Sequence, residues 1–397
     1  MKRYHLSVPA RVNVLGNPAD GNEGDLSTIS AAIEIRAGAW VEPAATLQFE
    51  ECRRTPDGGF TLVGRVEDAD LALALDGQAR LQKAAVRRLR SYSREFAAKL
   101  EQQKVRLATW TDVPRQSGLG GSSLLVILTL AAMRAAYELD PLVHNDYVLA
   151  ELTQRTEASD LGITCGYADR YVPIFGGLSY IDYRGKLFQR PVNEEPYATY
   201  ERLDAYVSRL PLVICSTGVV RDSGDVHGVM RSRYLQEYAA WERRNGCGNE
   251  LPFMVRTMDG VGATAWRGKI ALLRGDWETF GALMNENHRL VNEMMLHCGF
   301  AGGAGHEGNR LIHAALDAGA LGAKLTGAGG GGSVFALARP GEEERIAAVF
   351  RQVAAELGLR EAVVFVPALA QQGLVVEEMT TAEIPNSEVS GASWVSA

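Results

Sequence analysis

The sequence predicts an α+β protein of two domains, and three observations lead to this fold class. The chain has 397 residues, more than one hydrophobic core usually organises. Its first forty residues are β-rich, whereas later segments repeat apolar residues at helical spacing. A repeat of about 20–50 residues, the mark of solenoids and propellers, is absent. We expect domains over residues 1–205 and 206–370, then a weakly docked tail over 371–397, where Ser, Glu and Thr become frequent.

The elements of the first half follow from these patterns. A polar segment over 16–24 separates two β-rich stretches. Residues 79–103 predict one helix, because apolar residues recur every three or four positions and Lys and Arg occupy the other face. A strand over 105–111 leads into a glycine-rich loop at 114–123 and a helix over 124–136. That helix is apolar almost all round, which indicates burial.

Beyond this helix, strands and helices continue to alternate. A helix is expected over 146–159 and a short strand pair over 178–183. The second half predicts strands at 212–215 and 333–337 and helices at 226–244, 264–273, 278–294 and 309–318.

Charge and cysteine content exclude several classes of protein. The net charge is −7, from 48 acidic and 41 basic residues, which argues against a general nucleic-acid or anionic-membrane surface. The longest apolar stretch contains Arg134 and falls short of the ~20 residues that cross a bilayer. The first nine residues lack a secretory apolar run. Cysteines are odd in number and without CxxC spacing, so we expect reduced thiols, no zinc site and a cytoplasmic location. They are Cys52, Cys165, Cys215, Cys247 and Cys298.

The loop Gly118-Leu-Gly-Gly-Ser-Ser123 is the most informative feature. Glycines let backbone N–H groups approach an anion, and the start of the next helix adds its dipole, which suits a phosphate chain. The hydroxyls of Ser122 and Ser123 are candidate ligands for Mg²⁺ or a phosphate oxygen. No Walker A motif occurs. A tight strand-to-helix turn is the alternative interpretation.

Other candidate residues are ambiguous by themselves. The segment 327–332 matches GxGxxG, but a strand follows it, so we reject a dinucleotide fold and leave open a ligand-approach loop or a glycine hinge. Asp169 beside Arg170 is either an ion pair or a carboxylate that orients a hydroxyl. His227 and His288 are expected to be structural or supporting residues, because no HExxH or HxH pattern occurs.

Three segments together resemble the motifs of the GHMP kinases (galactokinase, homoserine kinase, mevalonate kinase and phosphomevalonate kinase). They are Pro9-Ala-Arg-Val-Asn-Val-Leu-Gly-Asn-Pro-Ala-Asp20, Pro114-Arg-Gln-Ser-Gly-Leu-Gly-Gly-Ser-Ser123 and Lys324-Leu-Thr-Gly-Ala-Gly-Gly-Gly-Gly332. Within the family, the first motif and Asp222-Ser-Gly-Asp-Val-His227 are most similar to glucuronokinase and its bacterial relatives. The resemblance implies a first domain with a left-handed βαβ unit, a ferredoxin-like second domain and a cleft between them.

The resemblance also implies roles for single residues. Asp169 would be the base or orienting carboxylate, and Arg11 the cation that lowers the pKa of the sugar hydroxyl or stabilises the transferring charge. ATP binding is implied for Pro114, Gly118, Leu119, Gly120, Gly121, Ser122, Ser123, Gly327, Gly329 and Gly330. Sugar binding is implied for Arg11, Asn17, Asp20, Asp169 and Arg170. Mg²⁺ would be held by Ser122 and an acidic residue.

Two positions depart from the family pattern. Galactokinases have Glu-His where this chain has Asn17-Pro18, which argues against galactose. The family's Mg²⁺-binding glutamate usually stands eleven residues before the catalytic aspartate, and that position is Ala158 here. Glu157 and Asp160 are the neighbouring acids, and Glu157 is the assignment we make.

The function expected from the resemblance is ATP-dependent phosphorylation of the anomeric (C1) hydroxyl of a sugar, with a uronic acid such as glucuronate as substrate. ATP, Mg²⁺ and a small sugar are the expected ligands, with no nucleic-acid or membrane partner, and the oligomeric state is left open. Alternatives are a kinase for a heptose phosphate, fucose or another sugar, a catalytically silent sugar-sensing regulator, and a decarboxylase of the mevalonate diphosphate branch. The candidate cations for the uronate carboxylate are Arg115, Arg170, Arg221 and Arg231.

Overall fold

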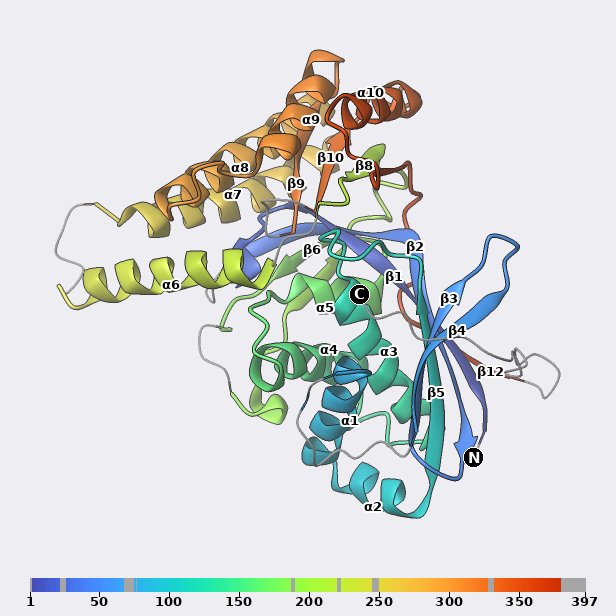
Figure 1. Cartoon of the computed structure of the whole chain (residues 1–397). Helices are drawn as coiled ribbons and strands as arrows, with labels where there is room; N and C mark the ends of the chain where they lie inside the picture. The colour runs from blue at the N-terminus through green and yellow to red at the C-terminus, as the bar shows by residue number, and fades with distance from the viewer. Residues whose placement is uncertain are drawn as a thin grey trace.

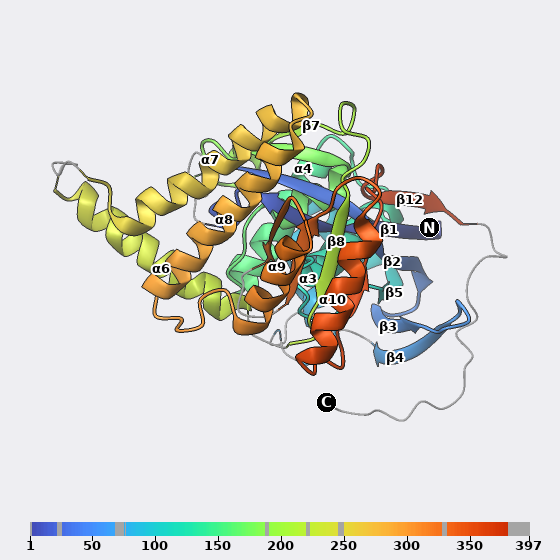
Figure 2. The same ribbon diagram turned by 90° about the horizontal axis from the view of Figure 1, so that it is seen from above.

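The fold is built from two β-sheets with helices packed against them (Figures 1 and 2). The computed structural model describes residues 2–21, 26–67, 75, 77–186, 190–219, 223–244, 250–327 and 332–379. The larger sheet contains β1 (Tyr4–Leu15), β2 (Ser27–Ala44), β3 (Gln48–Arg54), β4 (Phe60–Val66), β5 (Lys104–Thr111), β6 (Leu178–Asp182), β7 (Thr199–Arg202) and β12 (Val375–Glu378). The smaller sheet contains β8 (Leu212–Ser216), β9 (Gly322–Thr326), β10 (Ser333–Leu337) and β11 (Val363–Phe365).

Five helices gather beside the larger sheet (Figure 1). They are α1 (Arg80–Tyr92), α2 (Arg94–Gln102), α3 (Gly121–Ala136), α4 (Asp146–Arg155) and α5 (Ala168–Phe175). Its main strand order is β12-β1-β2-β5-β3-β4, while β6 pairs with β2 and β7 pairs with β6. The pair β3 and β5 is parallel, and the chain crosses between them through β4, α1 and α2.

The smaller sheet has ferredoxin-like topology, as predicted. Its strand order is β11-β8-β10-β9, and each neighbouring pair is antiparallel. Helices separate β8 from β9 and β10 from β11, which is the β-α-β-β-α-β pattern. These helices are α6 (Ser223–Glu242), α7 (Phe253–Leu273), α8 (Trp277–His297), α9 (His306–Asp317) and α10 (Glu343–Glu356). In Figure 2, α9 and α10 lie beside this sheet, with which they share a hydrophobic core.

The two halves are tied together by packing as well as by the chain. Helix α7 packs on β1 and β2, where a Cβ at Gly268 would collide with Leu15. Asn287 on α8 donates to the carbonyl oxygen of Asn17 at 3.1 Å, and its own Oδ1 accepts the N–H of Gly16 at 3.0 Å. The loop after β1 is therefore held from the second half of the chain.

Some predicted boundaries differ from the structure. The helix expected over 79–103 is two helices, because Ser93 is extended and its hydroxyl accepts the N–H of Phe96, capping α2. The strand β12 lies inside the predicted tail and pairs with β1. Residues 380–397 lie outside the described residues. The proposed domain limits remain predictions, and β7 and β8 stand on either side of residue 206.

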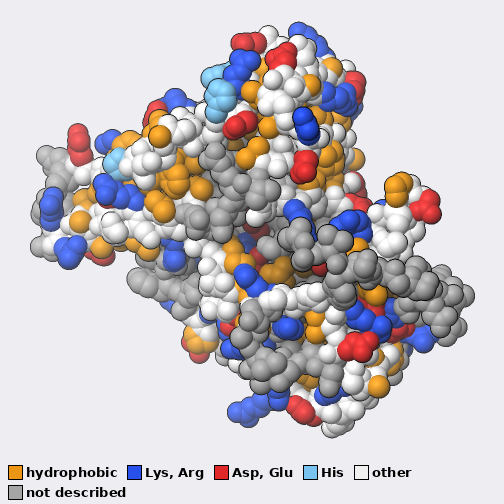
Figure 3. Space-filling model, in the orientation of Figure 1, with side chains coloured by type: hydrophobic (Ala, Val, Ile, Leu, Met, Phe, Trp, Pro, Cys, Tyr) orange, Lys and Arg blue, Asp and Glu red, His pale blue; other side chains and the backbone are white. Residues whose placement is uncertain are grey.

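The surface agrees with the mixed charge of the sequence. On the face seen in Figure 3, Lys and Arg side chains are interspersed with Asp and Glu. Within the described residues, no helix combines the length and apolarity needed to cross a membrane.

Candidate functional site

Strand β1 places two polar side chains against Asp169. Alternate residues of a strand share a face, so Arg11 and Asn13 point the same way while Val12 and Val14 enter the hydrophobic core. The Arg11 guanidinium donates from Nε to Asp169 Oδ1 at 2.6 Å, and Asn13 Nδ2 donates to the same oxygen at 3.3 Å. This sequence pattern brings the predicted catalytic pair, Arg11 and Asp169, into direct contact.

Asp169 stands in the first turn of α5 and is held ionised. Burial opposes its negative charge, but Arg11 and Arg170 outweigh that cost and lower its pKa to about 2. Arg11 Nη1 also donates to the carbonyl oxygen of Gly118 at 2.5 Å. The carboxylate therefore stands beside the predicted phosphate loop with a cation between them.

The predicted phosphate loop contacts the start of the third motif. Gly118 has φ +70°, and a Cβ there would lie 2.8 Å from the carbonyl oxygen of Thr326, while Gly327 has φ +76° and meets Gly118 in return. Gly120, with φ +89°, precedes the first turn of α3. The two glycine turns lie far apart in the sequence, and they need these small residues to approach each other. Gly329 and Gly330 lie outside the described residues.

A π-helical turn brings Glu157 to this loop. Helix α4 continues into a π turn over Thr156–Asp160, closed by a bond from the N–H of Leu161 to the carbonyl of Thr156 at 3.2 Å. Ser122 Oγ donates to Glu157 Oε1 at 2.7 Å, and Ser123 Oγ donates to Oε2 at 2.8 Å. A π turn accommodates one extra residue. This explains how Glu157, twelve residues before Asp169 instead of the usual eleven, reaches the two serines.

The neighbours of Glu157 do not share its position. Ala158 lines a pocket, and Asp160 forms a two-point ion pair with Arg88 at 2.8 and 2.6 Å. Arg170 is fully buried and contacts both Glu157 and Asp169. Of the two acids considered from the sequence, Glu157 is the one joined to the serines.

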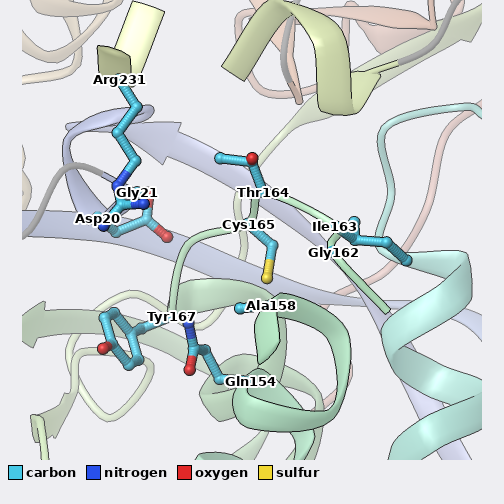
Figure 4. A pocket seen from close by; sticks show the side chains of 10 residues that line it. All are labelled: Asp20, Gly21, Gln154, Ala158, Gly162, Ile163, Thr164, Cys165, Tyr167 and Arg231. Atoms are coloured by element: carbon cyan, nitrogen blue, oxygen red, sulfur yellow. The ribbon is translucent and has the colours of Figure 1, made fainter. Parts of the chain in front are cut away.

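The pocket next to this cluster is lined mainly by polar groups (Figure 4). Its walls come from the loop after β1, from the end of α4, from the segment that precedes α5, and from helix α6. Its lining includes Asp20, Gln154, Tyr167 and Arg231. Asp20 Oδ2 accepts the N–H of Ala168 at 3.0 Å, which fixes it one residue from Asp169. Asp20 therefore joins the pocket to the backbone beside Asp169, whose own side chain is not part of the lining.

Asp20 differs from Asp169 in its pKa. Burial and the nearby negative charge of Asp169 raise the pKa of Asp20 to about 6, against the opposing effects of the Ala168 N–H, Arg11 and Arg170. Two carboxylates at one site therefore have well-separated pKa values. Such separation is frequent at functional sites.

Of the five predicted sugar-binding residues, only Asp20 lines this pocket, and Arg11 and Asp169 contact each other outside its lining. Arg170 is enclosed by Glu157, Asp169 and the carbonyl of Gly166 and does not line the pocket, because its charge compensates the buried carboxylates. Asn17 is also absent from the lining. Its carbonyl oxygen binds Asn287, and its buried Oδ1 lacks a hydrogen-bond partner within the described residues.

Sequence reasoning gave no individual role to two residues around the site, Asn13 and Lys324. Asn13 lies inside the first motif, and its alternation with Arg11 was the available signal. Lys324 is buried on β9 and donates to the carbonyl of Asn13 at 3.2 Å, and burial lowers its pKa to about 7. His227 on α6 has its pKa lowered to about 4, by burial first and then by Arg11 and Arg170 against the influence of Asp169. It is a neutral neighbour of the cluster, and the sequence prediction for it is a structural or supporting residue.

Comparison with known proteins identifies the fold and its motifs. The family model described as "GHMP kinases N terminal domain" matches residues 80–177, and "GHMP kinases C terminal" matches residues 269–356. The chain belongs to the GHMP kinase family. This match, together with relatives that are named kinases, shows an ATP-dependent kinase and confirms the resemblance drawn from the three motifs.

Several GHMP kinases resemble this one along most of its length. Glucuronokinase 1 of Arabidopsis thaliana is 29% identical over 82% of this chain and 83% of its own. A D-glycero-alpha-D-manno-heptose 7-phosphate kinase of Campylobacter jejuni is 27% identical over 62% of this chain and 65% of its own. The crystal structure of Lactococcus lactis galactokinase with galactose has a TM-score of 0.70 at 20% identity and covers 94% of this chain and 95% of its own, which shows the shared fold.

Proposed function

We propose that this GHMP kinase transfers the γ-phosphoryl group of ATP to the anomeric hydroxyl of a uronic acid such as glucuronate. The observation that carries the proposal is the continuous set of contacts from Ser122 through Glu157 and Arg170 to Asp169 and Arg11. It connects the phosphate loop to a carboxylate beside a polar pocket. The similarity to the glucuronokinases supports the uronic acid.

The residues at the phosphate loop fit Mg²⁺, which the family implies. Mg²⁺ prefers oxygen ligands and is usually held by one or two carboxylates together with substrate phosphates. The Ser122 hydroxyl and the Glu157 carboxylate offer such oxygens 2.7 Å apart. Among the described residues, no cluster of three or more His, Cys, Asp and Glu could hold a metal without the nucleotide. When bound, Mg²⁺ supplies positive charge to the phosphate oxygens.

The protein's own backbone and side-chain groups bind the phosphates, support the transferring charge and orient the sugar. Loop N–H groups and the start of α3 bind the phosphates, and Arg11 supports the charge that spreads over the transferring group. Asp169 accepts a hydrogen bond from the sugar hydroxyl and directs its oxygen toward the phosphorus. Because its pKa is about 2, Asp169 is an orienting carboxylate more than a strong base.

A substrate screen tests this function. Purified protein with ATP and Mg²⁺ is offered glucuronate, galacturonate, fucose, galactose and heptose phosphates, and ADP formation is followed. Phosphorus NMR then locates the new phosphate. We expect ADP release with a uronic acid and a product phosphorylated at C1. If a sugar binds saturably but no sugar leads to ADP release, the kinase proposal is contradicted and the sugar-sensing regulator is supported.

The pKa of Asp20 predicts a pH dependence of sugar binding. An ionised carboxylate accepts two sugar hydroxyls, whereas a protonated one loses part of that capacity. Protonation therefore opposes binding, and affinity for the sugar should fall as the pH is lowered through about 6. Calorimetric titration of the sugar from pH 5 to pH 8 measures this effect.

The matched variant is Asp20→Asn, which has no charge to titrate. It should bind more weakly at pH 8 and show a flatter pH profile than the wild type. A wild-type dissociation constant that stays constant across this range would remove Asp20 from sugar binding.

A further inference from the structure

The arginines expected at the anionic end of the substrate occupy different places in the structure. Arg115 has an 86% exposed side chain near Glu51 on β3. Arg221 lies outside the described residues. Arg231 lines the pocket but already interacts with another residue. The neutral wall of the pocket, rather than these cations, carries the clearest sign of what the pocket binds.

Gln154 belongs to this neutral wall, and its amide oxygen is buried without a hydrogen-bond partner. The residue is 3% exposed, and Oε1 has no partner among the described residues. Figure 4 shows its carboxamide beside Tyr167. A buried polar atom that lacks a partner destabilises a folded protein, whereas an apolar side chain of similar size carries no such cost. A group that enters the pocket and donates to Oε1 would remove this cost.

Gln154 also stands close to the residues that contact the phosphate loop. It precedes Glu157 by three residues, and Ala158 after it lines the same pocket. Residues three or four apart are neighbours on the surface of a helix. Glu157 in turn accepts a hydrogen bond from Ser122 at 2.7 Å. A sugar in contact with Gln154 is therefore about one helical turn away from the acid at the phosphate loop.

The charges near the pocket favour a hydroxyl as the partner of Gln154. Asp20 lines the pocket and is fixed by the N–H of Ala168, next to the ionised Asp169. Carboxylates accept hydrogen bonds and repel further anionic groups. The carboxamide of Gln154 is neutral and offers one acceptor and two donors, so it pairs with a hydroxyl in either direction. The hydroxyl-bearing side of a sugar ring matches such a wall.

We propose that Gln154 is a specificity-determining residue that accepts a hydrogen bond from one ring hydroxyl of the sugar, other than the anomeric one. This inference rests on the proposed kinase function. Asp20 and Gln154 come from the loop after β1 and from α4, so they hold the ring at two separate points. Two such anchors fix the orientation in which the C1 hydroxyl meets Asp169. A site built for a hydroxyl rejects an analogue that lacks it, because the polar group of the protein is left unpaired.

Deoxy analogues of the substrate test this contact. Kinetics are measured for wild type, Gln154→Met and Gln154→Glu with glucuronate and its 2-deoxy, 3-deoxy and 4-deoxy forms. For one analogue the wild type should lose about 10- to 100-fold in kcat/KM. This loss should vanish in Gln154→Met, while the losses for the other two analogues remain. Gln154→Glu keeps an acceptor at the same distance, so it should restore the discrimination.

Thermal unfolding separates this role from a structural one. Methionine removes the unpaired buried atom, so Gln154→Met without sugar should unfold at a temperature no lower than that of the wild type. The rise in unfolding temperature that glucuronate causes should shrink in the variant. If Gln154→Met unfolds at a lower temperature and keeps the full discrimination among the analogues, Gln154 is paired with a buried water and the inference is wrong.

The control is Gln82→Met on α1. Gln82 is also a buried glutamine, but its Nε2 donates to Thr109 Oγ1 at 3.3 Å and it does not line the pocket. Its variant should keep the wild-type order of preference among the four sugars. Should Gln154→Met fail to fold, Gln154→Asn takes its place, because the shorter side chain withdraws the oxygen from the pocket.

The outcomes separate the two proposals. A wild type that binds glucuronate but releases ADP with no sugar defeats the proposed function. Calorimetric binding of the same four sugars to wild type and Gln154→Met then decides the inference by the same pattern of losses. A wild type that phosphorylates glucuronate, with equal losses for every analogue in wild type and Gln154→Met, defeats only this inference.

Discussion

Asp169→Asn is expected to lower kcat by about 10²- to 10⁴-fold, the range typical for loss of a positioned group that handles a substrate proton. Asparagine is nearly isosteric, but it presents a neutral amide to the sugar hydroxyl. It also leaves Arg11 without the carboxylate to which it donates at 2.6 Å. Both changes act at the reacting oxygen, so they should reduce turnover far more than ATP affinity. Steady-state kinetics and ATP titration measure the two separately.

The matched control is Asp204→Asn. Asp204 is also a carboxylate whose pKa is lowered, first by its hydrogen bond with Arg202, but its partner is not one of the arginines that contact Asp169. Its variant should keep wild-type turnover. An Asp169→Asn protein that is folded and turns over at the wild-type rate would show that Asp169 has no role in the reaction.

The pKa of Asp169 also determines its effect on stability. Because the folded-state pKa is lowered from 3.8 to about 2, its ionised form stabilises the folded protein above pH 4, and this contribution is lost as the pH falls toward 2. In the working range of the enzyme Asp169 therefore stays ionised. An acid limb near pH 6 in wild-type activity would belong to Asp20 instead.

Glu157→Gln is expected to reduce kcat/KM at least about 100-fold at limiting Mg²⁺, because loss of even a supporting group at a metal site costs 10- to 100-fold. Glutamine preserves the size of the side chain and can still accept from Ser122 and Ser123. It loses the negative charge that attracts a cation and that compensates Arg170. The Mg²⁺ concentration for half-maximal activity should rise, and the binding advantage of ATP with Mg²⁺ over ATP with EDTA should shrink.

Asp160→Asn is the control for this prediction, since Asp160 is the other acid near the position that the family pattern indicates. Its carboxylate is engaged by Arg88 and has no contact with the serines. We expect its Mg²⁺ dependence to equal that of the wild type. If Asp160→Asn loses Mg²⁺ dependence while Glu157→Gln retains it, the assignment of the metal ligand is reversed.

Stability must be followed in parallel, because Glu157 is buried against a buried cation. Breaking a buried ion pair by removing one partner costs about 3–5 kcal/mol. Thermal unfolding of Glu157→Gln with and without ATP distinguishes this cost from a loss of metal binding. A variant that unfolds at a lower temperature but keeps the full Mg²⁺ response would show a structural role only.

The sequence predicted those structural features that depend on residues adjacent in the chain, such as loops and helices. The glycine loop before α3 was predicted because glycines and serines adjoin an apolar helix. Helical periodicity located residues 79–103 but not the break at Ser93. A cap of one residue hardly changes the spacing of apolar residues, so periodicity cannot detect it.

The α+β class and the order of the three motifs follow from the residue pattern, and the candidate pair Arg11 and Asp169 follows from the resemblance to the GHMP kinases. Long-range packing places Glu157 rather than Asp160 against Ser122, and it puts Arg231 rather than Arg115 or Arg170 on the pocket wall. These two kinds of feature differ in how far apart the interacting residues lie along the chain. Loop and helix patterns arise from adjacent residues, whereas the π turn and the approach of α6 depend on how separate segments pack together.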